Sequence, residues 1–263
     1  IRCAEYAGLW AQAAKHLRFL LENWKEPTGR RYLNSKLHWI LVEHLADSEF
    51  ALETFTYLHQ ENPNDLEVLE ALARITGEHG DTDTAVRYLQ QLATNAQSPK
   101  DAAKYYRHIA NAYYRVEKVD EAKTALLDAL DLNPNDMQAI NTLKSIYATT
   151  DNYDDLIGLL TREANLYDTD QKLVCLQQIA NIRQTIQFNY SLAIDAWSKV
   201  LDLSPNNINA LTQLVEITDI QDDAESMASY AEALLPLLQG ETKVKLQHRL
   251  GLLYYSKLLQ EEA

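Results

Sequence analysis

The sequence predicts an all-α fold built from antiparallel pairs of helices. Of its 263 residues, 46% are apolar and only 7 are Gly and 6 are Pro, a composition that favours helices joined by tight turns. A turn signature recurs at intervals of 71 residues, as Asn62-Pro63-Asn64-Asp65, Asn133-Pro134-Asn135-Asp136 and Ser204-Pro205-Asn206-Asn207. Further helix breakers lie midway between these turns, so the repeating unit is about 35 residues long.

One complete unit lies between Lys104 and Pro134. Its small and apolar residues recur at helical spacing in two successive segments, so each segment offers an apolar face to the other. These residues are Tyr106, Ile109, Ala110, Tyr113, Ala122, Leu126 and Ala129. Two amphipathic helices, packed antiparallel and ended by Pro134, are therefore expected here.

The same pattern extends along the chain. In order, it predicts helices over 9–24, 30–45, 48–60, 64–79, 82–95, 100–116, 119–131, 135–149, 152–166, 170–187, 190–202, 206–220, 223–238 and 241–260. Pairing them gives units at 1–28 (partial), 29–63, 64–98, 99–134, 135–169, 170–205, 206–240 and 241–263 (partial), within one solenoid over residues 1–263. The partial end units indicate a piece of a longer array, and such ends should expose apolar surface.

Details within the units support this register. Four of the second helices supply a small residue and, four positions later, a bulky one that fills the space beside it. The pairs are Ala51 and Phe55, Ala85 and Leu89, Ala122 and Leu126, and Ala193 and Trp197. The unit ending at Pro205 requires one extra residue near 187–190, and Pro236 should kink or end its helix.

The alternation of small and large residues from Tyr106 to Pro134 resembles the tetratricopeptide repeat (TPR) pattern. The resemblance covers the whole chain and is strongest over 104–134, 174–205 and 244–263. Lys144 and Val215 depart from it where a small residue is expected, and Leu156 and Met227 depart where Ala is expected. The resemblance implies a right-handed α-α superhelix that binds protein segments in a concave groove.

Composition and motifs argue against other classes of function. A net charge of −14 is unfavourable for binding phosphate backbones, and no apolar run is long enough to span a membrane. Cys3 and Cys175 are isolated and should be packed helix residues, and the seven His residues show no metal-binding spacing. The sequence Asp151 to Asp155 begins like a calcium loop, but Leu156 occupies the position that requires Gly. No catalytic residue, metal or cofactor is expected.

The exposed positions of the first helices should line the groove. In the three central units they are Lys104, Arg107, Asn111, Tyr114, Arg115, Gln138, Asn141, Gln177, Asn181 and Gln184. This polar, weakly basic lining contrasts with the preceding unit, which offers Glu67, Glu70, Arg74 and Glu78. The contrast indicates a binding surface in the centre of the chain.

Two interpretations of this lining are open. Asn111, Asn141 and Asn181 could form a ladder of amides that reads a peptide backbone, with Tyr114 as an aromatic anchor, or these side chains could be ordinary surface and packing groups. A clamp for a C-terminal carboxylate is disfavoured. Arg107 and Asn111 suit its first two places, but Thr142, Val174 and Gln178 stand where the clamp requires Asn, Lys and Arg.

The sequence therefore predicts a non-enzymatic scaffold that binds a protein or peptide partner. The alternative is a regulatory or substrate-recruiting segment of a larger multidomain enzyme. RNA binding by one base per unit is opposed by the acidic charge and by the mixed residues at equivalent groove positions. The sequence leaves the partner, the oligomeric state and the compartment open, with the cytoplasm slightly favoured for a soluble chain.

Overall fold

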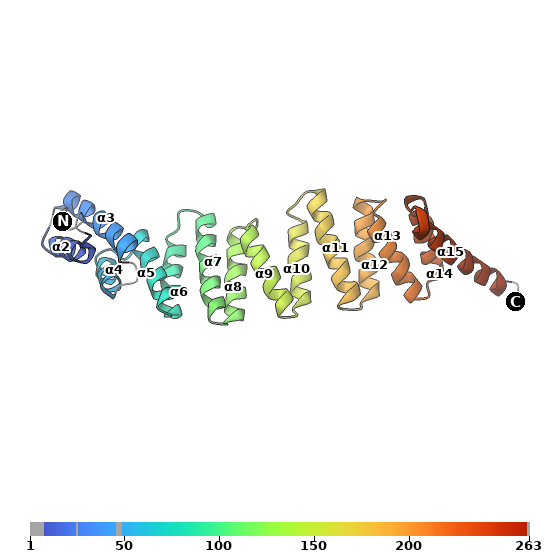
Figure 1. The fold of residues 1–263 in the computed structure, drawn as a ribbon, viewed down its shortest axis with the longest axis horizontal. Coiled ribbons are helices and arrows are strands. Elements are labelled where there is room, and N and C mark those ends of the chain that lie inside the picture. Colours follow the sequence, from blue (N-terminus) through green and yellow to red (C-terminus); the bar gives the residue numbers. More distant parts are fainter. Residues whose placement is uncertain (1–7, 25, 46–48, 262–263) are drawn as a thin grey trace. The chain divides into compact units, whose positions relative to one another are not determined.

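The computed structural model describes residues 8–24, 26–45 and 49–261, and these residues form helices and turns without a strand (Figure 1). The helices are α2 (Trp10–Asn23), α3 (Pro27–His44), α4 (Glu49–Glu61), α5 (Leu66–Glu78), α6 (Thr82–Thr94), α7 (Pro99–Arg115), α8 (Val119–Leu132), α9 (Met137–Thr149), α10 (Tyr153–Ala164), α11 (Thr169–Thr185), α12 (Tyr190–Leu203), α13 (Ile208–Ile220), α14 (Ala224–Leu234) and α15 (Gly240–Glu261). The all-α fold class and the helix order are confirmed. No described helix is both long and apolar enough to cross a membrane.

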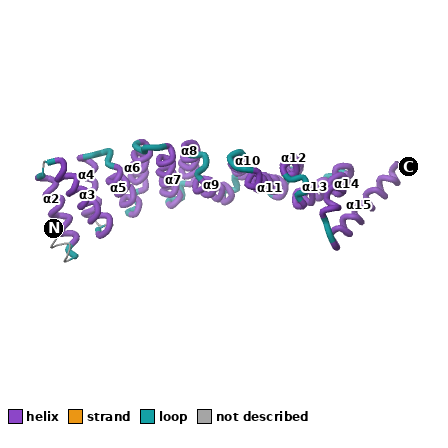
Figure 2. The backbone as a smooth tube through the Cα atoms, turned by 90° about the horizontal axis from the view of Figure 1, so that it is seen from above, coloured by secondary structure: helices purple, strands orange, loops and turns teal. Residues whose placement is uncertain are grey.

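The chain divides into two compact units, residues 1–146 and 147–263. In unit 1, α5 packs on α6, α6 on α7 and α7 on α8, and in unit 2 the same succession links α10 through α14. The tube in Figure 2 shows the short loops that reverse the chain between successive helices. The single continuous solenoid expected over residues 1–263 stays a prediction.

Each unit has its own apolar core. In unit 1, Leu17, Leu37 and Phe55 lie in one buried cluster that α2, α3, α4 and α5 share. In unit 2, Leu211 and Met227 lie in a cluster formed by α13, α14 and α15. The small residues of the second helices are buried as predicted, since Ala51, Ala85, Ala122 and Ala193 are each at most 2% exposed.

Side-chain caps and a proline set the helix ends. Asp65 begins α5 by accepting hydrogen bonds from two backbone amides, and Asn207 begins α13 in the same way with one. Pro236 ends α14, which passes at Leu235–Leu237 into a turn of 3-10 helix, as the missing N–H of proline requires.

The turn inside each helix pair repeats one backbone conformation. A residue with positive φ occurs at Gly80, Asp151 and Asp222, which are 71 residues apart, and again at Glu117 and Phe188, also 71 apart. Three residues separate α7 from α8, whereas four separate α11 from α12, so the predicted extra residue is present.

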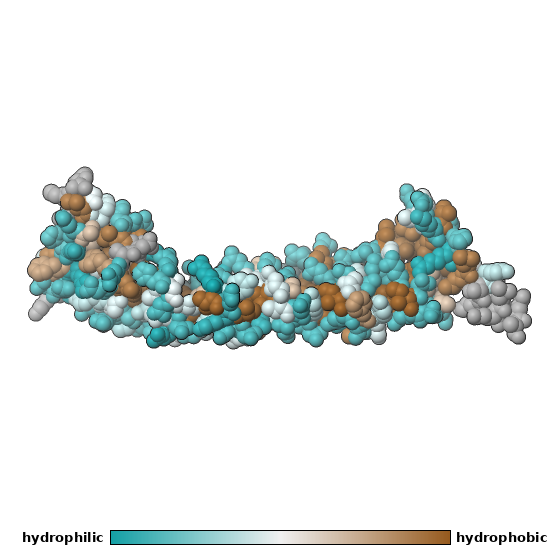
Figure 3. Space-filling view, turned by 60° about the horizontal axis from the view of Figure 1, so that its bottom comes forward, coloured by the Kyte–Doolittle hydropathy of each residue, from teal (hydrophilic) through white to brown (hydrophobic). Residues whose placement is uncertain are grey.

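Exposed apolar side chains lie on α2 and α3 in unit 1 and on α15 in unit 2, and also on other helices such as α8 and α13, so apolar surface is not confined to the ends of the described chain (Figure 3). They include Phe19, Tyr32 and Trp39, and Val244, Leu252 and Tyr255. Cys175 is buried in α11 as predicted, whereas Cys3 lies outside the described residues.

Candidate polar hollows between first helices

In each unit, hollows lie between successive first helices, with a second helix as the floor. The hollow between α7 and α9, called the α7–α9 hollow, has a volume of about 350 Å³. Arg107 and Asn111 line it from α7, Leu126 from α8, and Gln138, Asn141 and Thr142 from α9. The Asn111 and Asn141 side chains are exposed, so their amides face solvent in the free protein.

Arg107 is held by groups of the protein itself. Its Nε lies 2.9 Å from Asp136 Oδ2, and its Nη1 donates a hydrogen bond to Gln138 Oε1. Asp136 is 8% exposed and also caps α9, because its Oδ1 accepts from the Gln138 and Ala139 amides at 3.2 Å. Arg107 therefore ties α7 to the start of α9 through Asp136 and Gln138. Because the charges of Arg107 and Asp136 cancel, a ligand would meet a neutral pair here.

The α5–α7 hollow adjoins this one and has a volume of about 440 Å³. Its floor is apolar, formed by Ala85, Leu89 and Leu92 of α6. Lys104, Asn111 and Arg115 line it from α7. Because Asn111 lines both hollows, the two hollows are contiguous along the first helices.

Charges in the α5–α7 hollow are partly compensated. Tyr105 donates a hydrogen bond to Glu70 Oε1 at 2.7 Å, and burial together with this bond raises the pKa of Tyr105 to about 12. Burial and the charges of Lys104 and Arg107 lower the pKa of His108. His108 is therefore biased toward its neutral form in this hollow.

The α11–α13 hollow of unit 2 corresponds to the α7–α9 hollow of unit 1. It has a volume of about 330 Å³, and Gln177, Asn181, Trp197 and Gln213 are among the side chains that line it. Trp197 lies 71 residues after Leu126 and is likewise a floor residue. Trp197 Nε1 donates to Gln184 Oε1 at 2.9 Å, and Gln184 Nε2 donates to Gln213 Oε1 at 2.6 Å.

The predicted site residues thus fall into three groups. Lys104, Asn111, Arg115, Asn141, Gln177 and Asn181 line hollows. Arg107 and Gln138 also line the α7–α9 hollow, but they and Gln184 are engaged in bonds within the protein. Tyr114 is 48% exposed, but it lines none of the hollows described above. The binding roles of all ten residues stay predictions.

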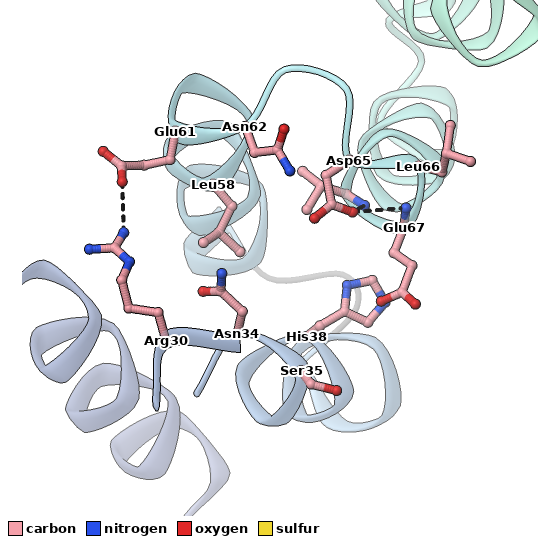
Figure 4. Close-up of a pocket in the computed structure, with 11 residues that line it drawn as sticks. Arg30, Asn34, Ser35, His38, Leu58, Glu61, Asn62, Asp65, Leu66 and Glu67 are labelled. Atoms are coloured by element: carbon pink, nitrogen blue, oxygen red, sulfur yellow. Dashed lines mark hydrogen bonds and ion pairs between the residues drawn. The ribbon is translucent and has the colours of Figure 1, made fainter. Parts of the chain in front are cut away.

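Sequence reasoning missed a third hollow in unit 1, the α3–α5 hollow, with a volume of about 520 Å³ (Figure 4). Asn34 and His38 rise into it from α3, and Asn62 and Asp65 face them from the turn before α5. The Asn-Pro-Asn-Asp turn is the sequence signal that could have indicated this hollow, since its Asp65 both caps α5 and lines the hollow.

The described side chains do not form a metal centre. Among them, no group of three or more His, Cys, Asp or Glu residues is arranged to hold a metal ion. The hollows offer amides, hydroxyls and charged groups beside apolar side chains.

No protein-family model matches the chain, and a search of curated proteins finds no match. Solved structures similar to it include a tetratricopeptide repeat protein from Parabacteroides merdae, at 15% identity and a TM-score of 0.45, covering 96% of this chain and 95% of that one. The C-terminal part of a TPR repeat-containing protein from Cytophaga hutchinsonii has 15% identity and a TM-score of 0.40, covering 85% of this chain and 78% of that one.

A third similar structure is YrrB, described as a TPR protein with an unusual peptide-binding site, at 17% identity and a TM-score of 0.36. The match covers 75% of this chain and 98% of YrrB. The helix pairs themselves are shown by contacts within this chain.

Proposed function

We propose that unit 1 is a protein-interaction scaffold that binds an extended segment of a partner along its first helices. The observation that carries this proposal is the position of Asn111, whose exposed side chain lines both the α5–α7 and the α7–α9 hollow. A segment lying across Asn111 would contact both hollows at once. Binding, rather than catalysis, is the activity that this lining supports.

Asn111 and Asn141 are suited to read a peptide backbone. A carboxamide donates to a carbonyl and accepts from an N–H at the same time, which matches the alternating groups of an extended chain. Both side chains are exposed, and neither is needed to cap a helix. In unit 2, Asn181 offers the corresponding amide in the α11–α13 hollow.

The engaged state of Arg107 supports backbone reading over charge recognition in the α7–α9 hollow. A carboxylate ligand would have to compete with Asp136, which holds the guanidinium at 2.9 Å. Neutral hydrogen bonds to Asn111 and Asn141 require no such exchange. The proposed ligand is therefore an internal segment of a partner rather than a free C-terminus.

The test is selection of peptides from a random library, followed by calorimetric titration of variants. Replacing Asn111 and Asn141 together by Ala should weaken binding by about 1–3 kcal/mol, because each hydrogen bond contributes about 0.5–1.5 kcal/mol. The melting temperature should stay unchanged. Asn165→Ala, an exposed amide in unit 2, is the matched control and should bind as the parent does. An unchanged affinity of the double variant would refute the proposal.

A further inference from the structure

The α3–α5 hollow carries charge that the protein does not neutralise. Asp65 and Glu67 line it, and no described cationic side chain forms an ion pair with either carboxylate. Arg30 also borders the hollow but is already bound (Figure 4). It contacts Glu61 at 2.7 Å and donates to the carbonyl oxygens of Leu21 and Trp24 at 3.1 and 3.2 Å.

A second part of unit 1 shows what such a hollow can hold. Asp136 follows Asp65 by 71 residues in an identical Asn-Pro-Asn-Asp turn, and each caps the next helix through Oδ1. Asp136 Oδ2, the oxygen not used for capping, binds the guanidinium of Arg107. Asp65 Oδ2 has no hydrogen-bond or ion-pair partner among the described side chains.

The residue that faces Asp65 explains the difference. Helix α3 aligns with α7 through its buried residues, because Leu33, Ile40 and Leu41 correspond to Ala102, Ile109 and Ala110. In this alignment His38 occupies the position of Arg107. The imidazole is shorter than an arginine side chain, so the hollow lacks the guanidinium that fills its counterpart.

The α3 wall also contains polar atoms without partners. Asn34 and His38 are half-buried, and their Oδ1 and Nδ1 atoms are buried without a hydrogen-bond partner among the described residues. Buried polar atoms are nearly always satisfied in native proteins, and an unsatisfied pair beside an open hollow is accounted for when a ligand completes the set. Asn34 points toward the hollow from α3, opposite the Asp65 turn (Figure 4).

From this geometry we infer that the α3–α5 hollow binds an arginine side chain of the partner segment. A guanidinium supplies five donors in a planar fork, which suits Asp65 Oδ2, the Glu67 carboxylate and the Asn34 amide together. Leu58 borders the same hollow and would contact the methylene groups of the arginine. This inference rests on the proposed scaffold function and specifies the chemistry of its partner.

The test is a titration with acetyl-arginine-methylamide, in which binding is monitored by NMR at the side-chain resonances of Asn34 and His38. The neutral isostere acetyl-citrulline-methylamide and the lysine analogue are the comparison ligands. The arginine compound should shift both resonances and should bind at least tenfold more tightly than the citrulline compound. It should also bind more tightly than the lysine compound and lose affinity as salt is added.

Asp65→Asn is the decisive variant, because Asn caps helices as well as Asp does and Asn207 already does so in α13. It should fold normally and bind the arginine compound at least tenfold more weakly, and Glu67→Gln should weaken binding as well. Asp120→Asn is the control. It alters an exposed carboxylate on α8 that pairs with Lys123, and it should leave arginine binding unchanged.

Equal binding of the arginine and citrulline compounds, or of the arginine and lysine compounds, would overturn the assignment, as would no binding of any of them. This test needs no extended peptide. If the arginine compound binds while the Asn111 and Asn141 double variant keeps its peptide affinity, the arginine site is retained and the scaffold proposal is refuted. If the arginine compound does not bind while the double variant loses peptide affinity, the scaffold proposal is retained and the arginine site is refuted.

Discussion

The α7–α9 hollow of unit 1 and the α11–α13 hollow of unit 2 are built on the same three-helix plan and bridged by different chemistry. In the first, an ion pair joins Arg107 to Asp136 over the smaller floor residue Leu126. In the second, neutral hydrogen bonds join Trp197, Gln184 and Gln213. The repeat thus fixes where successive first helices are tied together, and the individual side chains decide how.

This difference bears on ligand binding. The charged bridge leaves Asn111 and Asn141 as the groups of the α7–α9 hollow that a segment can engage without breaking a bond. In the α11–α13 hollow a segment could not engage Gln184 without breaking a bond, since its Oε1 accepts from Trp197 and its Nε2 donates to Gln213. Four sets of variants test how far the two regions differ.

The floor residues should show the largest effect. Trp197→Ala removes a side chain that is 2% exposed and leaves Gln184 Oε1 without its donor, so it should destabilise the protein by about 3–5 kcal/mol. Leu126→Ala should cost less, about 2–4 kcal/mol, because it creates a smaller cavity. Urea denaturation measures both. A smaller loss for Trp197→Ala than for Leu126→Ala would show that the two floors are not equivalent.

The charged bridge should come next. Asp136→Asn keeps the cap of α9 but removes the partner of Arg107, which should cost about 1–3 kcal/mol, between the values for exposed and buried pairs. Adding Arg107→Gln should recover part of the loss, because the lining then matches the Gln177 and Asn207 arrangement of unit 2. A double-mutant cycle without coupling between the two sites would contradict the bridge.

The pH dependence that Tyr105 contributes should have no counterpart at the equivalent position of α11, because Cys175 occupies there the position of Tyr105 in α7. The folded pKa of Tyr105, about 12, lies above the ordinary value of 10, so folding favours the neutral phenol. Its contribution is complete below pH 10 and is lost as the pH rises through 12. The free energy of unfolding should fall over this range. Tyr105→Phe should remove that part of the pH dependence, and an unchanged profile would argue against the bond to Glu70.

The turn residues should show the smallest effect. Phe188 adopts a φ of 51°, which costs a bulky residue about 1 kcal/mol, so Phe188→Gly should raise stability by up to about 1 kcal/mol. Glu117→Gly, in the corresponding turn of unit 1, should act in the same direction. Gly80→Ala is the reverse control and should lower the melting temperature. A loss of stability in Phe188→Gly would indicate that the exposed ring makes a contact that outweighs the strain.

Much of the fold follows from the sequence because it is encoded locally. Proline, capping residues and the spacing of small and large residues fix the helix ends to within a few residues, as the end of α14 before Pro236 illustrates. The same signals predict the buried Ala122 and Ala193.

The hollows depend on contacts between successive helix pairs, which a repeat pattern does not specify. Arg107 is at an exposed position of its helix by periodicity, yet the capping aspartate at the start of the next helix pair lies 2.9 Å from it. Gln184 is engaged in the same way through Trp197. The α3–α5 hollow was missed because His38 and Asp65 are far apart in the sequence and come together only where α3 and the turn before α5 line the same hollow.

Peptide binding in the hollows of unit 1 is tested most directly by photo-crosslinking. A selected peptide carrying a photoreactive residue at successive positions would be bound, irradiated and mapped by mass spectrometry. Crosslinks should fall on α5, α7 and α9 around Asn111 and Asn141, and the exposed outer residues of α8, such as Leu127 and Asp131, should remain unlabelled. Labelling concentrated on α6 and α8, with none on the first helices, would contradict binding in the hollows.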